Sequence, residues 1–397
     1  MERHALDALL TPDALRLLSS MDEPHSADDV LRTVAHLRKQ GHSLDTVSAV
    51  MGQVALRVKA HDKFGDFAER MLFSPEGLEV ASRLEVSSHH AGRFLQAGVT
   101  SVTDAGCGLG GDSLAFAGAG LRVRAVERDD VTAALAAYNL QPFDTVTVEH
   151  IDAETADLSD AEALWFDPAR REGSTRFQNP DDWSPSLEWV FHQATSRPTG
   201  IKLAPGMDRD LIPEGCEAQW VSWKGSVVEV VLWFGALARE GITRSALVLR
   251  DGGGAEITGP RDSPDAPVGD LQDYIAEPDG AVIRARLIGD LAREHCAHMI
   301  DPTIAYMTGP EPIYSPLVQC FRVRESVPYS TKNVQALIRG ADLGTLEIKK
   351  RGIDVDPAAL RTTLPLEGTD TATLILTRIA GIKTAILADR VAQLAST

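Results

Sequence analysis

The spacing of apolar residues along the chain changes near residue 97. Before that point apolar side chains recur three and four positions apart, as at Val30, Val34 and Leu37, which is typical of amphipathic helices. Beyond it, short apolar runs alternate with helical stretches as far as about residue 240. The pattern therefore predicts a helical region over residues 1–96, followed by a domain in which strands and helices alternate.

The alternating region holds short apolar runs that predict strands at residues 101–103, 121–126, 146–150, 163–166 and 200–203. Strands that alternate with helices form parallel sheets with helices on both faces. Two further runs, residues 219–224 and 227–234, flank Gly225 and predict a closing hairpin, which makes the last strand antiparallel. The predicted fold class is thus α/β, with a doubly wound sheet.

The rest of the chain predicts a smaller α+β region. A stretch rich in Gly, Pro and Asp, residues 251–270, predicts a long surface loop. After it, the pattern predicts helices at 281–296, 331–339 and 357–361, and strands at 318–323, 345–350, 371–377 and 384–387.

A glycine-rich turn carries the strongest chemical signal. The run TDAGCGLGGD, residues 103–112, follows a predicted strand and opens a predicted helix, with Gly106, Gly108 and Gly110 in the turn. Glycines allow the backbone to approach a ligand closely, and the helix N-terminus offers N–H groups. Glu127 ends the next strand, where a carboxylate can accept hydrogen bonds from ribose hydroxyls. The motif predicts a site for a nucleoside-containing cofactor.

Two cofactors fit this turn. Gly106, Gly108 and Gly111 satisfy G-x-G-x-x-G, the fingerprint of dinucleotide sites. Asp104, two residues before the first glycine, would repel a pyrophosphate and favour a ligand with an ammonium group, such as the methionine end of S-adenosylmethionine. We therefore predict S-adenosylmethionine, with a nicotinamide dinucleotide as the alternative and a glycine turn without a ligand as a third interpretation.

Two more acidic residues follow predicted strands. Asp152 comes after the third strand, where it can accept a hydrogen bond from an adenine amine or be a solvated loop aspartate. Asp167 and Pro168 end the buried run LWF at the carboxyl edge of the sheet, where open α/β proteins place their active sites. The Asp167 carboxylate can orient an amine toward a methyl donor, and in-line positioning is most of what methyl transfer needs. The alternative is a plain Asp-Pro turn.

Basic residues follow these motifs and also gather near the C-terminus. Arg170 and Arg171 can bind a phosphate or carboxylate of the substrate, or form a solvated loop. Lys202 ends the fifth predicted strand and either faces the same cleft or extends to solvent at the edge. Residues 311–351 hold seven Lys or Arg against four Asp or Glu, including Lys349, Lys350 and Arg351. This local excess predicts contact with RNA, or a solvated strand edge.

Composition limits the possible partners. The formal net charge of −18 excludes a bulk attraction to nucleic acid, so an RNA contact requires a local basic patch. The four cysteines are far apart and form no CxxC pair, which predicts a reducing, cytoplasmic location and no zinc ribbon. No run approaches the roughly 20 apolar residues that cross a bilayer. The pair His89-His90 lacks ligand-spaced partners, so we predict no metal site.

Residues 104–111, together with Glu127, Asp152 and Asp167-Pro168, resemble the class I S-adenosylmethionine-dependent methyltransferases over about residues 97–238. More narrowly, the whole chain resembles a bacterial group of methyltransferases with a ferredoxin-like segment and a C-terminal THUMP-like domain. That resemblance rests on residues 63–65, 166–171, 274–278 and 347–352. Residues 73–76 are also similar to the segment before the catalytic domain in cap-guanine N2 methyltransferases.

The resemblance implies a Rossmann-like, seven-stranded methyltransferase sheet and a division into four parts. These are an N-terminal helical region (1–96), a cofactor-binding methyltransferase domain (97–240), a ferredoxin-like α+β segment (241–325) and a THUMP-like domain (326–397). It implies cofactor contacts from Asp104, Gly106, Gly108 and Glu127, adenine contact from Asp152, and a catalytic corner at Asp167-Pro168. THUMP domains deliver tRNA or rRNA to modification enzymes, so the implied substrate is structured RNA, methylated on a base nitrogen.

The corner departs from the pattern of amino-group methyltransferases, which show Asp/Asn-Pro-Pro followed by an aromatic residue. Ala169 replaces the second proline and Arg170 replaces the aromatic residue. C5 methylation of pyrimidines is disfavoured, because it needs a nucleophilic cysteine and none closely follows the corner. A small-molecule or protein methyltransferase, an NAD-dependent oxidoreductase and a non-catalytic RNA-binding module remain as alternatives.

Overall fold

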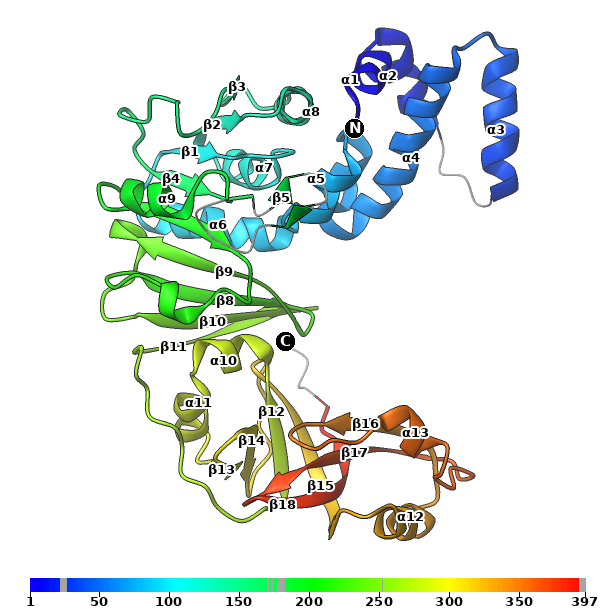
Figure 1. Cartoon of the computed structure of the whole chain (residues 1–397), viewed down its shortest axis with the longest axis vertical. Coiled ribbons are helices and arrows are strands. Elements are labelled where there is room, and N and C mark those ends of the chain that lie inside the picture. Colours follow the sequence, from blue (N-terminus) through cyan, green and yellow to red (C-terminus); the bar gives the residue numbers. More distant parts are fainter. Residues whose placement is uncertain (22–26, 170, 173–174, 177–182, 252, 393–397) are drawn as a thin grey trace. The chain divides into compact units, whose positions relative to one another are not determined.

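The computed structural model describes residues 1–21, 27–169, 171–172, 175–176, 183–251 and 253–392 (Figure 1). The chain forms two compact units. The first comprises Met1–Leu203 and Trp233–Ala238, and the second comprises Ala204–Leu232 and Arg239–Thr397. No described helix combines the length and the apolar character that crossing a membrane requires.

The N-terminal region is helical, as the spacing predicts. Its helices are α1 (Arg3–Leu9), α2 (Pro12–Ser19), α3 (Ala27–Lys39), α4 (Leu44–Phe64), the 3-10 helix Gly65–Arg70, α5 (Pro75–Val80) and α6 (Leu84–Gln96). Side-chain caps fix several of these starts: the hydroxyl of Ser74, for example, accepts the N–H of Gly77 at 3.1 Å, and Pro75 is the first helical residue.

One hydrophobic core joins these helices to the glycine-rich turn. Buried residues of α1, α2 and α4, such as Leu9 and Val54, cluster with Leu109 of the turn and with Val131 and Leu135 of the helix that follows the second strand. Because the helices share this core, they support the loop that is predicted to bind the cofactor.

A doubly wound sheet follows. Its elements are β1 (Ser101–Ala105), α7 (Gly111–Gly118), β2 (Arg122–Glu127), α8 (Asp130–Leu140), β3 (Val146–His150), β4 (Leu164–Phe166), α9 (Leu187–Ala194), β7 (Thr199–Leu203), β8 (Glu217–Trp223) and β9 (Ser226–Phe234). These strands lie in the order β3-β2-β1-β4-β7-β9-β8. The pairs β1–β2, β1–β4, β2–β3 and β4–β7 are parallel, which confirms the predicted α/β class.

The predicted hairpin is present. Strands β8 and β9 are neighbours joined by Lys224 and Gly225, whose φ angles of 48° and 83° are both positive. A two-residue turn with two positive φ angles matches the twist of antiparallel strands.

The sheet extends beyond the seven strands that the sequence predicts. Strand β10 (Arg244–Arg250) pairs in parallel with β8, and β11 (Gly253–Gly259) pairs antiparallel with β10, which gives a nine-stranded sheet in the described part of the chain. The loop predicted over residues 251–270 is therefore wrong at 253–259. Glycines suggested a loop, but a Cβ on Gly254 would lie 2.9 Å from the carbonyl oxygen of Val248, so glycine there permits close strand contact.

The rest of the second unit is built on another sheet. Its elements are β12 (Tyr274–Pro278), α10 (Gly280–Ala285), α11 (Ile288–Glu294), β13 (His298–Asp301), β14 (Ile304–Gly309), β15 (Val318–Pro328), α12 (Thr331–Arg339), β16 (Leu343–Lys350), α13 (Pro357–Arg361), β17 (Asp370–Ile379) and β18 (Ile382–Arg390). The strand order is β13-β14-β12-β15-β18-β17-β16. The single helix predicted over 281–296 is wrong, because Arg286 takes a left-handed conformation (φ 60°) between α10 and α11.

Candidate active site

The glycine-rich turn between β1 and α7 presents bare backbone at the carboxyl edge of the sheet. Gly106, Gly108 and Gly110 have φ angles of 108°, 56° and 83°, a region that disfavours residues with a Cβ. A Cβ on Gly108 would meet no heavy atom within 4 Å, whereas one on Gly106 would lie 3.7 Å from the carbonyl oxygen of Asp167. The turn therefore adjoins the Asp167-Pro168 corner and leaves room for a ligand above Gly108.

Glu127 lies at the rim of this turn. One carboxylate oxygen accepts the N–H of Gly108 at 3.0 Å and the other accepts the N–H of Asp129 at 2.9 Å. The carboxylate at the end of β2 thus holds the glycine turn in place. This is the position from which the sequence predicts a contact with ribose hydroxyls.

Asp104 is a buried carboxyl group beneath the turn, 1% exposed. Its Oδ2 accepts a hydrogen bond from the hydroxyl of Ser113 at 2.6 Å, and its Oδ1 has no hydrogen-bond partner among the described residues. Burial, reinforced by the charge of Asp112, raises the pKa of Asp104 to about 8. An unpartnered buried oxygen is unfavourable, so this group is suited to a cationic hydrogen-bond donor.

Asp112, in the first turn of α7, is the second buried carboxylate. It accepts hydrogen bonds from His90 Nδ1 at 2.9 Å and from the Ser82 hydroxyl at 3.2 Å, and its Oδ2 lies 3.8 Å from Lys202 Nζ. Burial opposes its ionisation, but Lys202 and His90 outweigh burial and hold the pKa of Asp112 well below its usual range. Asp112 is therefore the ionised member of the pair that it forms with Asp104.

Lys202 and Asp167 lie together, so Lys202 faces the corner, one of the two positions that the sequence leaves open for it. Lys202 is the next-to-last residue of β7 and Asp167 follows β4, and these strands pair in parallel. Lys202 Nζ lies 2.5 Å from Asp167 Oδ2 and donates to the Ser82 hydroxyl at 2.8 Å. The Asp167 side chain is 34% exposed and that of Lys202 only 9%, so the carboxylate reaches the surface of the site and the ammonium lies beneath it.

The segment after Asp167 runs along the same edge. Pro168 is buried, and Ala169 exchanges two backbone hydrogen bonds with Ser184, at 2.8 and 3.1 Å. Arg170 lies outside the described residues. Arg171 belongs to the short strand β5 (Arg171–Glu172), which pairs with β6 (Thr175–Arg176). Their predicted role in substrate binding stays a prediction.

Asp152 lies one residue beyond the segment that extends β3. The N–H of Ile151 bonds to the carbonyl of Glu127 at 3.0 Å, and Asp152 Oδ1 accepts the N–H of Glu154 at 2.9 Å. The half-buried carboxylate is thus held in a local turn beside the end of β2. Its contact with adenine stays a prediction.

The motif at residues 63–65 stabilises the helical region that precedes the sheet. Lys63 Nζ donates to the carbonyls of Leu78, Glu79 and Ala81, each at 2.8 Å, and closes the C-terminal end of α5. Burial, with the nearby cations Arg83 and Lys202, lowers the pKa of Lys63 to about 8. Lys63 therefore packs within the helical region by binding the end of α5.

Sequence reasoning missed the polar residues that brace the corner, namely Ser82, His90, Asp112 and Ser113. The signal was present in α7, whose sequence GDSLAFAG places Asp112 and Ser113 in an otherwise apolar helix. Buried polar groups in such a setting require partners. His90, read from the sequence as structural, is buried against Trp165, with ring centroids 4.5 Å apart. Within the described ranges, no group of three or more His, Cys, Asp or Glu side chains is arranged to hold a metal ion.

Two of the three consecutive basic residues at positions 349–351 are held by an acidic partner. Lys349 Nζ lies 2.7 Å from Glu277 Oε2, and Arg351 lies 3.1 Å from Glu277 Oε1. Arg351 also lies over the ring of Tyr306, 5.5 Å from its centroid. Lys350 is exposed and donates to the carbonyl of Val355 at 2.8 Å. These contacts join the segments 274–278 and 347–352, two of those on which the resemblance rests.

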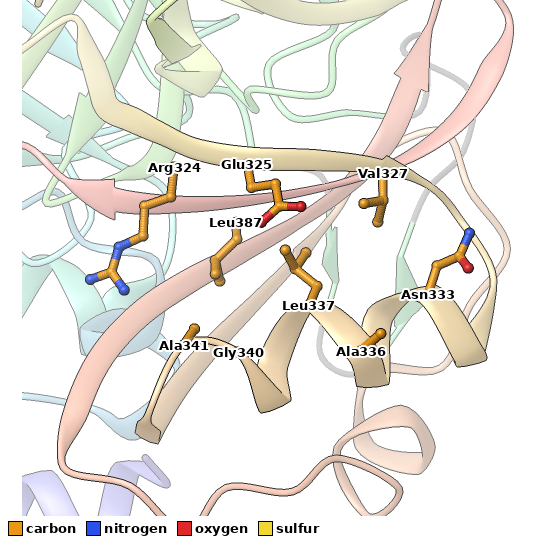
Figure 2. Close-up of a pocket in the computed structure, with 9 residues that line it drawn as sticks. All are labelled: Arg324, Glu325, Val327, Asn333, Ala336, Leu337, Gly340, Ala341 and Leu387. Atoms are coloured by element: carbon orange, nitrogen blue, oxygen red, sulfur yellow. The ribbon is translucent and has the colours of Figure 1, made fainter.

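A cavity of about 470 Å³ lies between α12 and the strands β15 and β18 (Figure 2). None of the predicted site residues lines it. Leu337 and Leu387 form part of its apolar wall, while Arg324, at one end, is paired with Asp389 at 2.5 Å. The cavity is lined by Arg324, Glu325, Val327, Asn333, Ala336, Leu337, Gly340, Ala341 and Leu387.

The strand order, the glycine turn and the acidic corner define a Rossmann-like methyltransferase fold. A crystal structure from Porphyromonas gingivalis W83, assigned as a methyltransferase, has this fold: its TM-score is 0.75 over 98% of this chain and 99% of that one, at 20% identity. Residues 318–390 match a family model described as THUMP domain-like, and residues 2–60 match one described as a domain of unknown function.

A sequence relationship gives the family. The chain is 31% identical over 337 residues to an uncharacterized S-adenosylmethionine-dependent methyltransferase of Mycobacterium tuberculosis, which is found in strains CDC 1551 and H37Rv. The match covers 82% of this chain and 90% of the relative. The chain therefore belongs to the S-adenosylmethionine-dependent methyltransferases, and the oxidoreductase alternative is set aside.

Proposed function

We propose that the protein methylates a base nitrogen in structured RNA, a tRNA or an rRNA. The observation that carries this proposal is the contact between the glycine turn and the Asp167-Pro168 corner. Because a Cβ on Gly106 would approach the Asp167 carbonyl to 3.7 Å, a methyl donor above the turn and an acceptor at the corner would be neighbours. Proximity of this kind is the main requirement of a direct group transfer.

The residues at the turn fit S-adenosylmethionine. The unpartnered Oδ1 of Asp104 suits the ammonium of the methionine part, and Gly106, Gly108 and Gly110 leave backbone exposed to the ligand. Glu127 would accept from the ribose and Asp152 from the adenine. When bound, the cofactor supplies an electrophilic methyl group on a positively charged sulfur.

Asp167 has the properties of a group that orients the acceptor. Its carboxylate reaches the surface of the site, where it would accept the N–H of an uncharged nitrogen and direct the lone pair of that nitrogen toward the methyl group. As the nitrogen forms its bond to carbon, the bond from carbon to sulfur breaks and its electron pair stays on sulfur. The surplus proton of the nitrogen then passes to Asp167 and on to water.

The match of residues 318–390 to a THUMP domain-like family model supports RNA as the substrate class. The local excess of basic residues between 311 and 351 agrees with this in a chain of net charge −18. Arg170, Arg171 and Lys350 would contact the RNA backbone. The acidic net charge favours the second candidate, methyl transfer to a small molecule or a protein.

Two measurements test the proposal. Purified protein is incubated with methyl-labelled S-adenosylmethionine and, separately, with total RNA, a protein extract and a metabolite extract; label is expected in RNA. Mass spectrometry of nucleosides from a deletion strain and its parent then identifies the modified base that the deletion removes. Label confined to protein or metabolites, with an unchanged nucleoside profile, would establish the second candidate instead.

A further inference from the structure

The ammonium of Lys202 is directed inward, into a cluster of oxygens. Its Nζ lies 2.5 Å from Asp167 Oδ2, 2.8 Å from the Ser82 hydroxyl and 3.8 Å from Asp112 Oδ2. A lysine that only shields a strand edge extends its ammonium to water. With a side chain 9% exposed, Lys202 instead compensates two carboxylates, one in the cofactor-loop helix and one at the corner.

We propose that Lys202 is a positioning residue for methyl transfer: its ammonium holds the Asp167 carboxylate in one orientation and in its ionised form at the corner. This rests on the proposed function of Asp167. Ser82 and Asp112 anchor the ammonium on its other side, so that Lys202 cannot follow Asp167 if that side chain rotates. A carboxylate that is 34% exposed on an unbraced side chain would sample several rotamers.

The anchor connects the corner to the cofactor loop. Asp112 follows the glycine turn by one residue, in the first turn of α7, and His90 on α6 holds its other oxygen at 2.9 Å. The position of Lys202 is therefore tied to the same helix start that shapes the turn. Methyl donor and acceptor depend on one continuous set of hydrogen bonds and ion pairs, which keeps their separation constant.

The ion pair also determines what Asp167 does chemically. An adjacent ammonium favours the charged form of a carboxyl group and makes it a weaker base. Asp167 then serves as a hydrogen-bond acceptor for an N–H during bond formation, and takes up the proton only after the nitrogen has become cationic. Such a corner suits an uncharged ring or exocyclic nitrogen better than the ammonium of a protein lysine, which Lys202 would repel.

The pH dependence of the reaction reports this role. Titratable groups that act on this pair include Asp104 on β1, Asp112 on α7 and Lys63 on α4, and His90 on α6 is bonded to Asp112. Asp104 is expected to act on cofactor affinity, so its titration is removed at saturating S-adenosylmethionine. The value of kcat under those conditions reports groups in the loaded enzyme.

The experiment compares Lys202→Met, Lys202→Arg and the double variant Lys202→Met with Asp112→Asn, in the full-length protein. Lys202→Met is expected to lower kcat about 100-fold, the loss typical of a small misplacement of a reacting group. The KM for S-adenosylmethionine should stay within about twofold of its original value, since the cofactor loop is intact. The acid limb of the kcat profile should move to higher pH, because Asp167 loses the ammonium that favours its charged form. Lys202→Arg should restore part of kcat and part of the original pH profile.

The double variant separates positioning from folding. Removing Lys202 alone leaves two carboxylates uncompensated, which is destabilising, and Asp112→Asn relieves one of them. The double variant should therefore regain thermal stability while its kcat stays low. If its kcat recovers together with its melting temperature, the role of Lys202 is structural and the inference is wrong.

Lys63→Met is the matched control, since Lys63 is a partly buried lysine that caps α5 and contacts neither carboxylate. It should lower the melting temperature and shift the pH profile much less than Lys202→Met does, because Lys63 acts on Lys202 only through space; an equal shift in this control would overturn the inference. The two proposals can fail separately. If the parent protein labels protein or metabolites instead of RNA, the RNA function fails and the Lys202 comparison is made on that acceptor. If it labels RNA and Lys202→Met keeps its kcat and pH profile, the Lys202 inference fails alone.

Discussion

Two clusters of charged side chains, one in each compact unit, differ in how completely their charges are paired. In the corner cluster, formed by Asp104, Asp112, Asp167 and Lys202, one ammonium is paired with two of the three carboxyl groups, and the third, Asp104, retains an oxygen without a hydrogen-bond partner in the described structure. The Glu277 cluster, formed by Glu277, Lys349, Arg351 and Tyr306, pairs each oxygen of one carboxylate with a cation.

The difference separates a cluster that needs a ligand from one that holds the fold. A buried polar atom without a partner raises the free energy of the protein until a ligand satisfies it, whereas a fully paired carboxylate gains nothing from a further partner. Burial, with the charge of Asp112 added to it, raises the pKa of Asp104 to about 8, so this carboxyl group also lacks the partner that would favour its charged form. The comparison predicts large functional effects from the corner cluster and mainly structural effects from the Glu277 cluster.

The largest expected effect is that of Asp167→Ala. Loss of the carboxylate that orients the acceptor should lower methyl transfer on the order of 10³-fold, within the range of a positioned acid–base group. Binding of S-adenosylmethionine, measured by calorimetry, should remain largely intact because Asp104, Glu127 and the glycine turn are unchanged. Full methyl transfer by this variant would remove the catalytic assignment of the corner.

Asp104→Asn should have the next largest effect, on cofactor affinity. The loss of a charge-assisted hydrogen bond to the ammonium should weaken binding of S-adenosylmethionine by roughly 10- to 100-fold. In the parent protein the carboxyl group is protonated below a pH of about 8, and a cationic ligand favours its ionised form. Affinity should therefore rise with pH up to about 8, with proton release on binding, and calorimetry in buffers of different ionisation enthalpy measures both.

The effect of Asp104→Asn on stability provides a separate check on the protonation state of Asp104. The folded protein holds the Asp104 proton up to a pH of about 8, whereas the unfolded chain releases it near the ordinary value of 3.8. The folded state binds more protons between these values, so the free energy of unfolding of the parent falls as pH rises through this interval. Asp104→Asn removes that fall, and its melting temperature should exceed that of the parent by more at pH 8 than at pH 5. An equal difference at both values would mean that Asp104 is already ionised at pH 5.

The Glu277 cluster should respond to substitution through stability. Glu277→Gln leaves Lys349 and Arg351 partly buried without their carboxylate and should lower the free energy of unfolding by about 1–2 kcal/mol, allowing for the exposure of these groups. Denaturant titration measures the loss, and methyl transfer below the melting temperature should be unaffected. A normal stability together with weakened RNA binding would show that this cluster serves RNA, contrary to the comparison.

Local signals made much of the site predictable. The glycine turn, Glu127, Asp152 and the Asp167-Pro168 corner each follow a strand, and strand ends in a parallel sheet meet at one edge, so reading the strands was enough to bring them together. The alternation of strands and helices up to residue 240 was also predictable, because apolar residues recur at a different spacing in helices than in strands.

The support of the corner was not predictable, because its contacts join residues far apart in the chain. Lys202 bonds to Ser82 across 120 positions, and the spacing gives no sign of it. The side chain of a lysine near the end of a strand can extend to solvent or point into the protein, and only the fold decides between the two. The basic residues at 349–351 similarly predict a positively charged surface, because their acidic partner Glu277 lies more than 70 positions away in the sequence.

The smallest expected effect is that of Lys350→Ala, which tests whether any of the basic run faces RNA. Lys350 is exposed and bonds only to a local carbonyl, that of Val355, among the contacts described, while its neighbours on either side are bound to Glu277. Loss of one phosphate contact should weaken RNA binding a few-fold for all sequences and reduce the slope of log affinity against log salt by about 1. Stability should not change, in contrast to Glu277→Gln. Because Lys349→Ala removes the same formal charge from a paired position, it is the matched comparison: if it alters the salt slope as much as Lys350→Ala, a paired cation still reaches the RNA, and complete pairing does not separate structural clusters from binding ones.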